Sequence, residues 1–315
     1  MLFEDIIQRI YQDSLSTRQQ GSKFEKLVKK LLQLAPSFNA RFADVYLWSE
    51  FSDAFGLAQN DIGIDIMARD FDGKWVAIQC KALEPSTSLA LADLKNFLGV
   101  RTITSPSGKV FCHISQHLIF HTCKDVSQNV FKALQQAQDS TTLEAKAYGY
   151  YDLQELGILW ESFDTDDINS LKLSGKKQLR EHQKQALSAI QSHFIEQGNT
   201  RGKVIMACGT GKSLLAIRTI DSLVNPGEIA LFLAPSLALI DQMIKEFFKE
   251  SLSPSYQVFA VCSDGKVGSA KSEDLHENEL CISPTTSPKA LAHAINVMLV
   301  NVAISTGGGG TMRIA

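Results

Sequence analysis

Three features are missing from this sequence. No apolar run is long enough to cross a bilayer, and no secretion signal precedes the first charged residues. The six cysteines include no C-x-x-C pair and no regular spacing, so a disulfide framework is not expected. We therefore expect a soluble protein without a membrane partner, located in the reducing cytoplasm.

The chain also lacks an excess of basic residues and any internal repeat. It has 31 Lys and Arg against 34 Asp and Glu, a formal net charge of −3. Contacts with a nucleic acid would therefore depend on local basic patches. A length of 315 residues with 44% hydrophobic residues is enough for two domains with real cores.

A glycine loop in the second half carries the clearest chemistry. The apolar run 204–206 leads into a seven-residue loop, and a helical pattern of apolar residues follows at 214–220. The loop consists of Ala207, Cys208, Gly209, Thr210, Gly211, Lys212 and Ser213. Strand, loop and helix in this order predict a polyphosphate site, where Lys212 supplies positive charge and Ser213 a hydroxyl for Mg²⁺. The alternative is a chance Gly-Lys-Ser in an ordinary loop.

A hairpin in the first half carries a second group of polar residues. The apolar runs 62–68 and 74–81 flank Asp72-Gly73, a strong hairpin signal. Asp65 lies on the first strand, and Gln79 and Lys81 share one face of the second. A carboxylate and a further oxygen ligand can hold Mg²⁺, while a lysine orients or deprotonates a water. The alternative is an exposed strand face that happens to carry charges.

Helices and further strands surround this hairpin. Apolar spacing predicts helices over 1–10, 22–34, 89–98 and 126–137, and strands over 44–48, 116–122 and 145–150. The segment 152–160 also resembles a packed helix. We therefore expect an α/β fold in which helices flank a mixed sheet. Lys95 and Arg101 are candidate phosphate contacts.

Five Cys and His residues in the first half of the chain suggest a zinc site. Their spacing matches no standard finger or ribbon, and a strand would divide them between its two faces. We expect buried thiols and hydrogen-bonded histidines instead. The residues are Cys112, His113, His117, His121 and Cys123.

The hairpin resembles the PD-(D/E)xK nuclease fold, specifically its Mrr-like branch, in which G-x-D is followed by Q-x-K. The resemblance covers about residues 15–125. It implies a catalytic site of Asp65, Gln79 and Lys81, completed by Glu25 on the preceding helix, with Asp65, Glu25 and Gln79 as metal ligands.

The glycine loop resembles motif I of superfamily 2 helicases and translocases, although Met206 stands where the general phosphate-loop pattern has glycine. The resemblance implies ATP binding in a RecA-like domain, a parallel sheet with helices on both faces. Gln183 would recognise adenine, with Arg180 beside it. Residues 229–236 resemble motif Ia, with Ser236 and Gln242 as candidate nucleic-acid contacts.

These resemblances give a domain plan. We expect a nuclease domain over 1–165, a linker over 166–178, and the N-terminal part of the RecA-like domain over 179–315, with an atypical tail from about 296. Nuclease followed by motor resembles the N-terminal part of Type ISP restriction-modification enzymes. No N-P-P-[YF] stretch is present, so methylation is not expected.

Motif II of the motor, usually D-E-x-H, is missing from the sequence. Asp264 follows an apolar run, but a loop acid is the better interpretation. We therefore expect a truncated or frame-disrupted product, in which hydrolysis of ATP is unsupported.

The leading hypothesis is a restriction-type fragment that cuts double-stranded DNA with Mg²⁺ and binds ATP. Two alternatives remain: a non-catalytic DNA- and nucleotide-binding remnant, and a phosphate loop that serves a kinase or an unrelated ATPase. The oligomeric state and the DNA site are left open.

Overall fold

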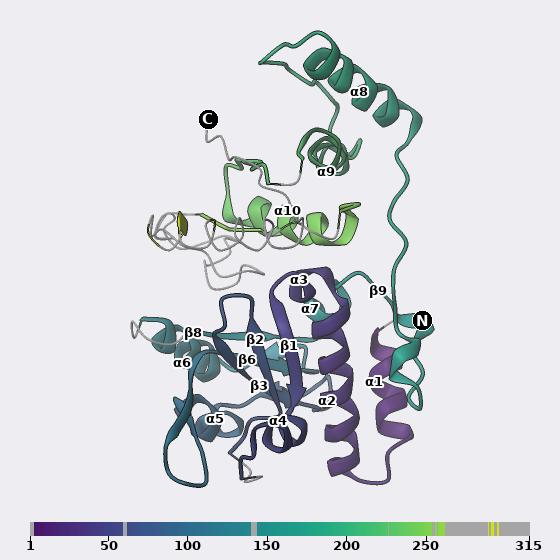
Figure 1. Ribbon diagram of the computed structural model, residues 1–315. Coiled ribbons are helices and arrows are strands. Elements are labelled where there is room, and N and C mark those ends of the chain that lie inside the picture. Colours follow the sequence, from purple (N-terminus) through teal and green to yellow (C-terminus); the bar gives the residue numbers. More distant parts are fainter. Residues whose placement is uncertain are drawn as a thin grey trace. The chain divides into compact units, whose positions relative to one another are not determined.

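The computed structural model describes residues 3–58, 62–139, 144–225, 227–253, 256, 258–261, 289, 291, 292 and 295. The chain divides into two compact units, residues 1–175 (unit 1) and 176–315 (unit 2). Figure 1 shows the elements of each unit, which we describe separately. Among the described residues, no helix is long and apolar enough to span a membrane.

Unit 1 is built on a six-stranded mixed sheet with the order β1-β2-β3-β6-β5, to which β8 adds by pairing with β6. Neighbours β1, β2 and β3 are antiparallel, β6 runs parallel to both β3 and β8, and β5 is antiparallel to β6. The strands are β1 (Phe42–Leu47), β2 (Ile66–Asp70), β3 (Trp75–Lys81), β5 (Thr102–Thr104), β6 (Val110–His121) and β8 (Glu144–Tyr148). The expected mixed α/β sheet is confirmed.

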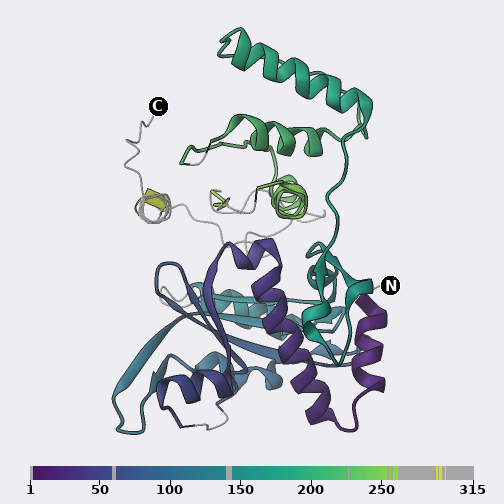
Figure 2. The same ribbon diagram turned by 45° about the vertical axis from the view of Figure 1, so that its right-hand side comes forward.

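Each face of this sheet buries its own core, because successive side chains of a strand point to opposite faces. Ile66 and Ile78 belong to one core, Met67 and Ala77 to the other. The first core is covered by α1 (Phe3–Gln12), α2 (Thr17–Leu34), α3 (Pro36–Asn39) and α7 (Tyr150–Gln154). The second includes residues of α4 (Trp48–Phe55), α5 (Lys95–Gly99) and α6 (Gln128–Asp139). Figure 2 shows α1 and α2 side by side.

The N-terminal helices follow the expected apolar spacing. Helix α1 buries Phe3, Ile6, Ile7 and Ile10, which occupy one helical face. Helix α2 begins earlier than predicted because the hydroxyl of Ser16 caps it by accepting the N–H of Gln19 at 3.2 Å.

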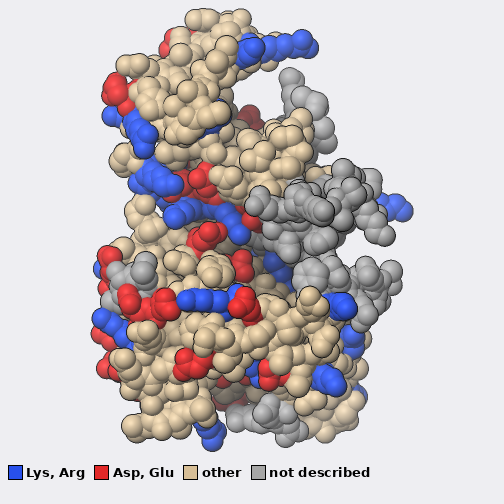
Figure 3. Space-filling view, turned by 180° about the vertical axis from the view of Figure 1, so that it is seen from behind, with Lys and Arg blue, Asp and Glu red and all other residues tan. Residues whose placement is uncertain are grey.

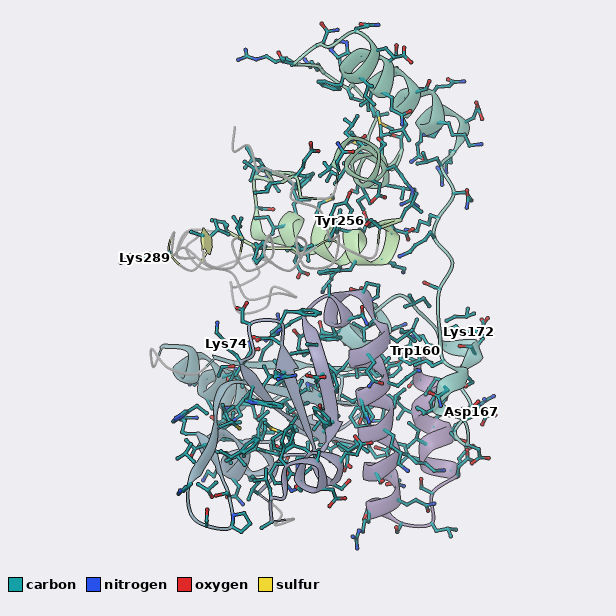
Figure 4. The ribbon with its side chains drawn as sticks, in the orientation of Figure 1. Lys74, Trp160, Asp167, Lys172, Tyr256 and Lys289 are labelled. Carbon is teal, nitrogen blue, oxygen red and sulfur yellow. The ribbon has the colours of Figure 1, made fainter. Side chains whose placement is uncertain are left out.

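The β2–β3 hairpin forms, but β2 begins at Ile66 and not at 62, so Asp65, predicted on the first strand, directly precedes it. Gly73 has φ of 79°, the left-handed conformation that favours glycine. Lys74 lies beside it at the turn, as Figure 4 shows.

The C-terminal part of unit 1 differs from the predicted helix over 152–160. Helix α7 ends at Gln154, and β9 (Ile158–Leu159) then pairs with β10 (Lys172–Leu173). Between them lie the 3₁₀ turns η2 (Trp160–Ser162) and η3 (Ile168–Ser170). Trp160, labelled in Figure 4, packs on Phe3 with ring centroids 4.7 Å apart. This contact with a distant segment outweighs local helical propensity. Two short strands, β4 (Ser88–Leu89) and β7 (Asp125–Val126), also pair in unit 1.

Residues 289, 291, 292 and 295 of unit 2 are helical, and four helical elements lie before them among the described residues. These four elements are α8 (Glu181–Gln191), the π-helical turn η4 (Ser192–Glu196), α9 (Lys212–Leu223) and α10 (Leu237–Glu250). Helices were expected at all three α positions.

The runs 204–206 and 229–236, expected to be strands, do not form strands in the described structure. Neither run pairs with a strand in the described part of unit 2, and Ile205, Leu231 and Leu233 are each more than four-fifths exposed. A parallel strand forms only when neighbouring strands accept its backbone hydrogen bonds. Asp264 and the expected helix after Pro284 fall largely outside the described residues.

Candidate functional sites

Asp65 is fixed from two sides in the nuclease hairpin, residues 62–81. Its backbone N–H donates to Ile78 (2.9 Å), and its carbonyl accepts the N–H of Trp48 at the start of α4 (2.8 Å). Its carboxylate Oδ2 accepts the N–H of Cys80 at 2.6 Å. The side chain therefore takes a place in the hydrogen-bond ladder just before β2 begins, which holds the carboxylate at one position beside β3.

Three charged groups predicted for the site gather around Cys80. Burial raises the pKa of the Cys80 thiol well above its usual value, the charges of Asp65 and Glu25 raise it further, and Lys81 lowers it. Since such interactions weaken with distance, Glu25 of α2 lies in the neighbourhood of the hairpin residues. The structure thus brings together residues that are 56 positions apart in sequence, from Glu25 to Lys81.

Gln79 contributes an oxygen to the same region. The register that pairs Ile66 with Ile78 places Gln79 across from Asp65. Gln79 is only 5% exposed, and its Oε1 has no hydrogen-bond partner within the described structure. A buried amide oxygen without a partner costs about 1–3 kcal/mol, a cost that a bound cation would offset.

Gly63, in the G-x-D pattern, makes room for this side chain. Its φ is 78°, and a Cβ there would lie 3.4 Å from Nε2 of Gln79 and 3.5 Å from the backbone N of Phe97. Both the conformation and the close approach of two neighbours favour glycine.

Thr122 supports the end of β3, and sequence reasoning missed it. Its N–H donates to Lys81 (3.2 Å), and its Oγ1 accepts the N–H of Leu83 (2.8 Å) and donates to the carbonyl of Leu83. This buried threonine therefore braces the chain directly after Lys81. A threonine after a predicted strand gives no sequence signal for that role.

The described residues contain no group of three or more His, Cys, Asp or Glu placed to hold a metal ion. Mg²⁺ also accepts carboxamide oxygens as ligands, so Asp65, Glu25 and Gln79 are the candidate Mg²⁺ ligands. Of the five residues considered for zinc, His113 is exposed and the other four are buried. Burial lowers the pKa of both His117 and His121 to about 4.

The glycine loop of unit 2 contains two glycines in the left-handed conformation, which anion-binding nests also use. Gly209 and Gly211 have φ of 75° and 80°, and α9 begins at Lys212. Nζ of Lys212 donates to the carbonyl of Ala207 at 3.1 Å, and Oγ1 of Thr210 donates to the same carbonyl at 2.7 Å. Cys208 is an exposed free thiol, and Ser213 is the second residue of α9.

Gln183 lies against this loop. Its Nε2 donates to the carbonyls of Thr210 and Gly211, both at 3.1 Å, and its Oε1 accepts the N–H of Arg180 at 2.8 Å. Its side chain is only 3% exposed, whereas Arg180 is exposed. Gln183 of α8 therefore contacts the loop, whereas Arg180, the residue before α8, contacts Gln183 through its backbone N–H.

The candidate nucleic-acid contacts lie on the surface. Lys95, Arg101 and Gln242 are exposed, and the Ser236 hydroxyl caps α10 by accepting the N–H of Leu239 at 3.3 Å. Figure 3 shows Lys and Arg interspersed with Asp and Glu on the face it presents. This mixture agrees with a formal net charge of −3.

Comparison with known families agrees with the two resemblances. Residues 33–170 match the Mrr-type profile described as "Restriction endonuclease", and residues 176–296 match the profile described as "Type III restriction enzyme, res subunit". Comparison with curated proteins finds no match.

A solved structure has a similar fold. It is described as "ATP-dependent Type ISP restriction-modification enzyme LlaBIII bound to DNA", and it matches with a TM-score of 0.71 at 24% sequence identity. The match covers 94% of this chain but only 17% of that one. The chain therefore spans less than a fifth of the length of that enzyme.

Proposed function

We propose that this chain, which joins an Mrr-like restriction endonuclease domain to a superfamily 2 helicase-like domain, cleaves DNA phosphodiester bonds at the nuclease hairpin with Mg²⁺. The observation that carries the proposal is the buried Gln79 oxygen, which has no hydrogen-bond partner among the described residues, beside the Asp65 carboxylate, which accepts a backbone N–H of β3. Oxygen donors of this kind suit Mg²⁺.

Each residue of the nuclease hairpin site would have a separate role in phosphodiester cleavage. Carboxylates of Asp65 and Glu25 and the Oε1 of Gln79 would hold the metal, which when bound supplies Lewis-acid stabilisation of phosphate charge. Lys81, at the end of the same strand as Gln79, would orient the attacking water or take its proton. Thr122 would keep the backbone of Lys81 in place.

The glycine loop supports a second activity, nucleotide binding. Two left-handed glycines precede a helix that begins at Lys212, so backbone N–H groups and an ammonium are available to a polyphosphate. The Ser213 hydroxyl would be a ligand of the Mg²⁺ that accompanies ATP. The sequence has no D-E-x-H tetrapeptide, and we therefore expect binding without DNA-stimulated hydrolysis.

Plasmid cleavage tests the nuclease. With Mg²⁺, the wild type is expected to nick or cut weakly, and Asp65→Asn and Lys81→Met to lose at least about 100-fold, the scale of general acid–base and metal-ligand contributions. Lys74→Met is the matched control, because Lys74 is exposed at the opposite end of the hairpin. Equal, negligible cutting by the wild type and Asp65→Asn would instead support a non-catalytic remnant.

Measurements of ATP binding and ATP hydrolysis test the second activity, nucleotide binding. We expect Mg²⁺-dependent ATP binding that Lys212→Ala weakens, because the loop loses its mobile positive charge. Addition of DNA should leave turnover near background. Robust DNA-stimulated hydrolysis that disappears in Lys212→Ala would contradict the proposed lack of hydrolysis, and transfer of phosphate to another molecule would indicate a kinase.

A further inference from the structure

Gly21 lies inside helix α2, five residues after the Ser16 cap. After proline, glycine is the least favourable residue in a helix interior. The backbone does not require it, because its φ lies outside the left-handed region. No packing contact requires it either: among the described residues, a Cβ at Gly21 would approach only Oε1 of Glu25, at 3.8 Å, an ordinary contact. Glycine at this position therefore leaves room on the helix surface that no part of the described chain fills.

This room adjoins the metal ligands proposed for the nuclease hairpin. The 3.8 Å distance places the carboxylate of Glu25 one turn back along α2, beside Gly21. Besides burial, the charges of Asp65 and Glu25 raise the pKa of the Cys80 thiol, so the same carboxylate lies in the neighbourhood of β3. A phosphate bound to a metal at Glu25 would therefore lie next to the bare backbone of Gly21.

Arg18 lies on the same face of α2 as Glu25. Seven positions separate the two residues, which is within about 20° of two full helical turns and about 10 Å along the helix axis. Gly21 lies between them on this face. Since one strand of DNA rises about 3.4 Å per base, the separation corresponds to roughly three bases. Arg18 is exposed, and the planar guanidinium of arginine suits phosphate oxygens.

The surroundings of this face suit a polyanion that passes the metal site. Glu25 is the only acid of α2, against five Lys and Arg residues in the same helix. In Figure 1 the first turns of α2 lie at the same end of unit 1 as α4, and Trp48 at the start of α4 donates its N–H to the carbonyl of Asp65 at 2.8 Å. The start of α2 and the hairpin site therefore belong to one end of unit 1.

We propose that the DNA strand to be cleaved runs along this face of α2, from the phosphate at the metal site past Gly21 to Arg18. The bare backbone of Gly21 lets the strand lie close to the helix, and Arg18 binds a phosphate roughly three bases from the cleaved bond. The inference rests on the DNA cleavage proposed above and adds the path of the substrate to it.

Two substitutions at Gly21 separate DNA binding from folding. Gly21→Ala and Gly21→Leu are expected to raise the urea midpoint of unit 1, because both side chains favour a helix more than glycine does. Both should weaken binding of a short DNA duplex, Leu more than Ala, and slow Mg²⁺-dependent cutting on the order of tenfold or more, because a displacement of about 1 Å misplaces the reacting groups. Gly175→Ala is the matched control, since a Cβ there also has open space, and it should change neither binding nor cutting.

The salt dependence of DNA binding tests Arg18. Binding of the duplex to the full chain is measured without divalent metal, so that no cleavage occurs. Arg18→Gln is expected to lower the slope of log affinity against log salt by about one, the value for one phosphate contact. Lys172→Gln changes an exposed lysine of β10 and should keep the wild-type slope.

Three results would overturn the inference. They are wild-type binding and cutting by Gly21→Leu, an Arg18→Gln slope equal to that of Lys172→Gln, and a lower urea midpoint of the Gly21 variants, which would assign the glycine to the fold. A wild type that binds DNA but does not cut it would reject the proposed cleavage, while the binding measurements would still test the path of the strand. A wild type that binds no DNA would reject both.

Discussion

At the scale of single residues, two buried histidines make unit 1 sensitive to acid. His117 packs edge-on against Phe97 with centroids 4.6 Å apart. Next to His121, a Cβ at Gly149 would lie only 2.7 Å from Cε1, so the ring is closely confined. Burial is the main cause that lowers the pKa of each ring to about 4, because the charged form of a buried imidazole is disfavoured away from water.

The pH dependence follows from this shift. Because the folded pKa lies below the ordinary value of 6.5, the unfolded chain binds protons first, and stability is complete above about pH 6.5 and falls as the pH drops toward 4. The loss is on the order of 3 kcal/mol for each histidine at the acid end. Urea unfolding at pH 7.5, 6 and 5 measures it through tryptophan fluorescence, since all three tryptophans lie in unit 1.

Two variants separate the buried rings from the exposed one. A double change of His117→Gln and His121→Gln should flatten the dependence on pH, although it lowers stability at pH 7.5. His113→Gln should keep the wild-type slope, because His113 is exposed. Wild-type stability that stays level between pH 7.5 and 5 would contradict the assignment.

At the scale of elements, a buried arginine joins two helices of unit 2 to the chain that enters it. Arg218 of α9 donates to the carbonyl of Lys177 at 3.0 Å and also to the carbonyl of Glu250 at the end of α10. It pairs with Asp221 at 3.4 Å, and Asp221 accepts the hydroxyl of Ser251 at 2.7 Å. Arg218 is only 6% exposed, so these partners depend on it.

Arg218→Met is therefore expected to destabilise unit 2 by roughly 3–5 kcal/mol, because it removes the positive partner of a buried carboxylate and the donor to two carbonyls. Hydrogen exchange along residues 212–223 measures the effect, since unit 2 contains no tryptophan. Arg201→Met is the control, an exposed arginine of the same unit. Similar protection in the two variants would show that packing, not Arg218, holds the helices.

At the scale of the whole molecule, unit 1 contains both of its hydrophobic cores. The first includes residues from Phe3 to Leu171 and the second lies between Phe51 and Val130. Residues 166–175, expected to be linker, include η3 and β10, and Leu171 among them is only 3% exposed. The first hydrophobic core therefore extends to Leu171, close to the boundary between the units at residue 175.

A fragment of residues 1–175 should accordingly fold by itself. Its tryptophan-detected unfolding midpoint is expected to equal that of the same unit in the full chain, and it should keep any Mg²⁺-dependent cutting. The shorter fragment 1–165 lacks Leu171 and β10, and should lose about 2–3 kcal/mol from that side chain alone. Equal stability of the two fragments would place the boundary near 165.

The sequence by itself determined the features that depend on neighbours in the chain. The turn at Gly73, the apolar face of α1 and the glycine loop before Lys212 each follow from spacing and residue type within a few positions. The resemblances then placed Asp65, Gln79 and Lys81 together with Glu25, and the structure brings these four to one region.

Only the tertiary structure decided the features whose partners are distant. Thr122 contacts Lys81 of β3, 41 positions away in the sequence. Trp160 lies in a 3₁₀ turn because it packs on Phe3. The amide of Gln183 is directed by carbonyls 27 and 28 positions away. Such contacts depend on where separate elements meet, and neither residue type nor local periodicity carries that information. The Gln79 oxygen, which has no partner in the described part of the chain, and the contact of Gln183 with the loop could therefore be found only from the folded chain.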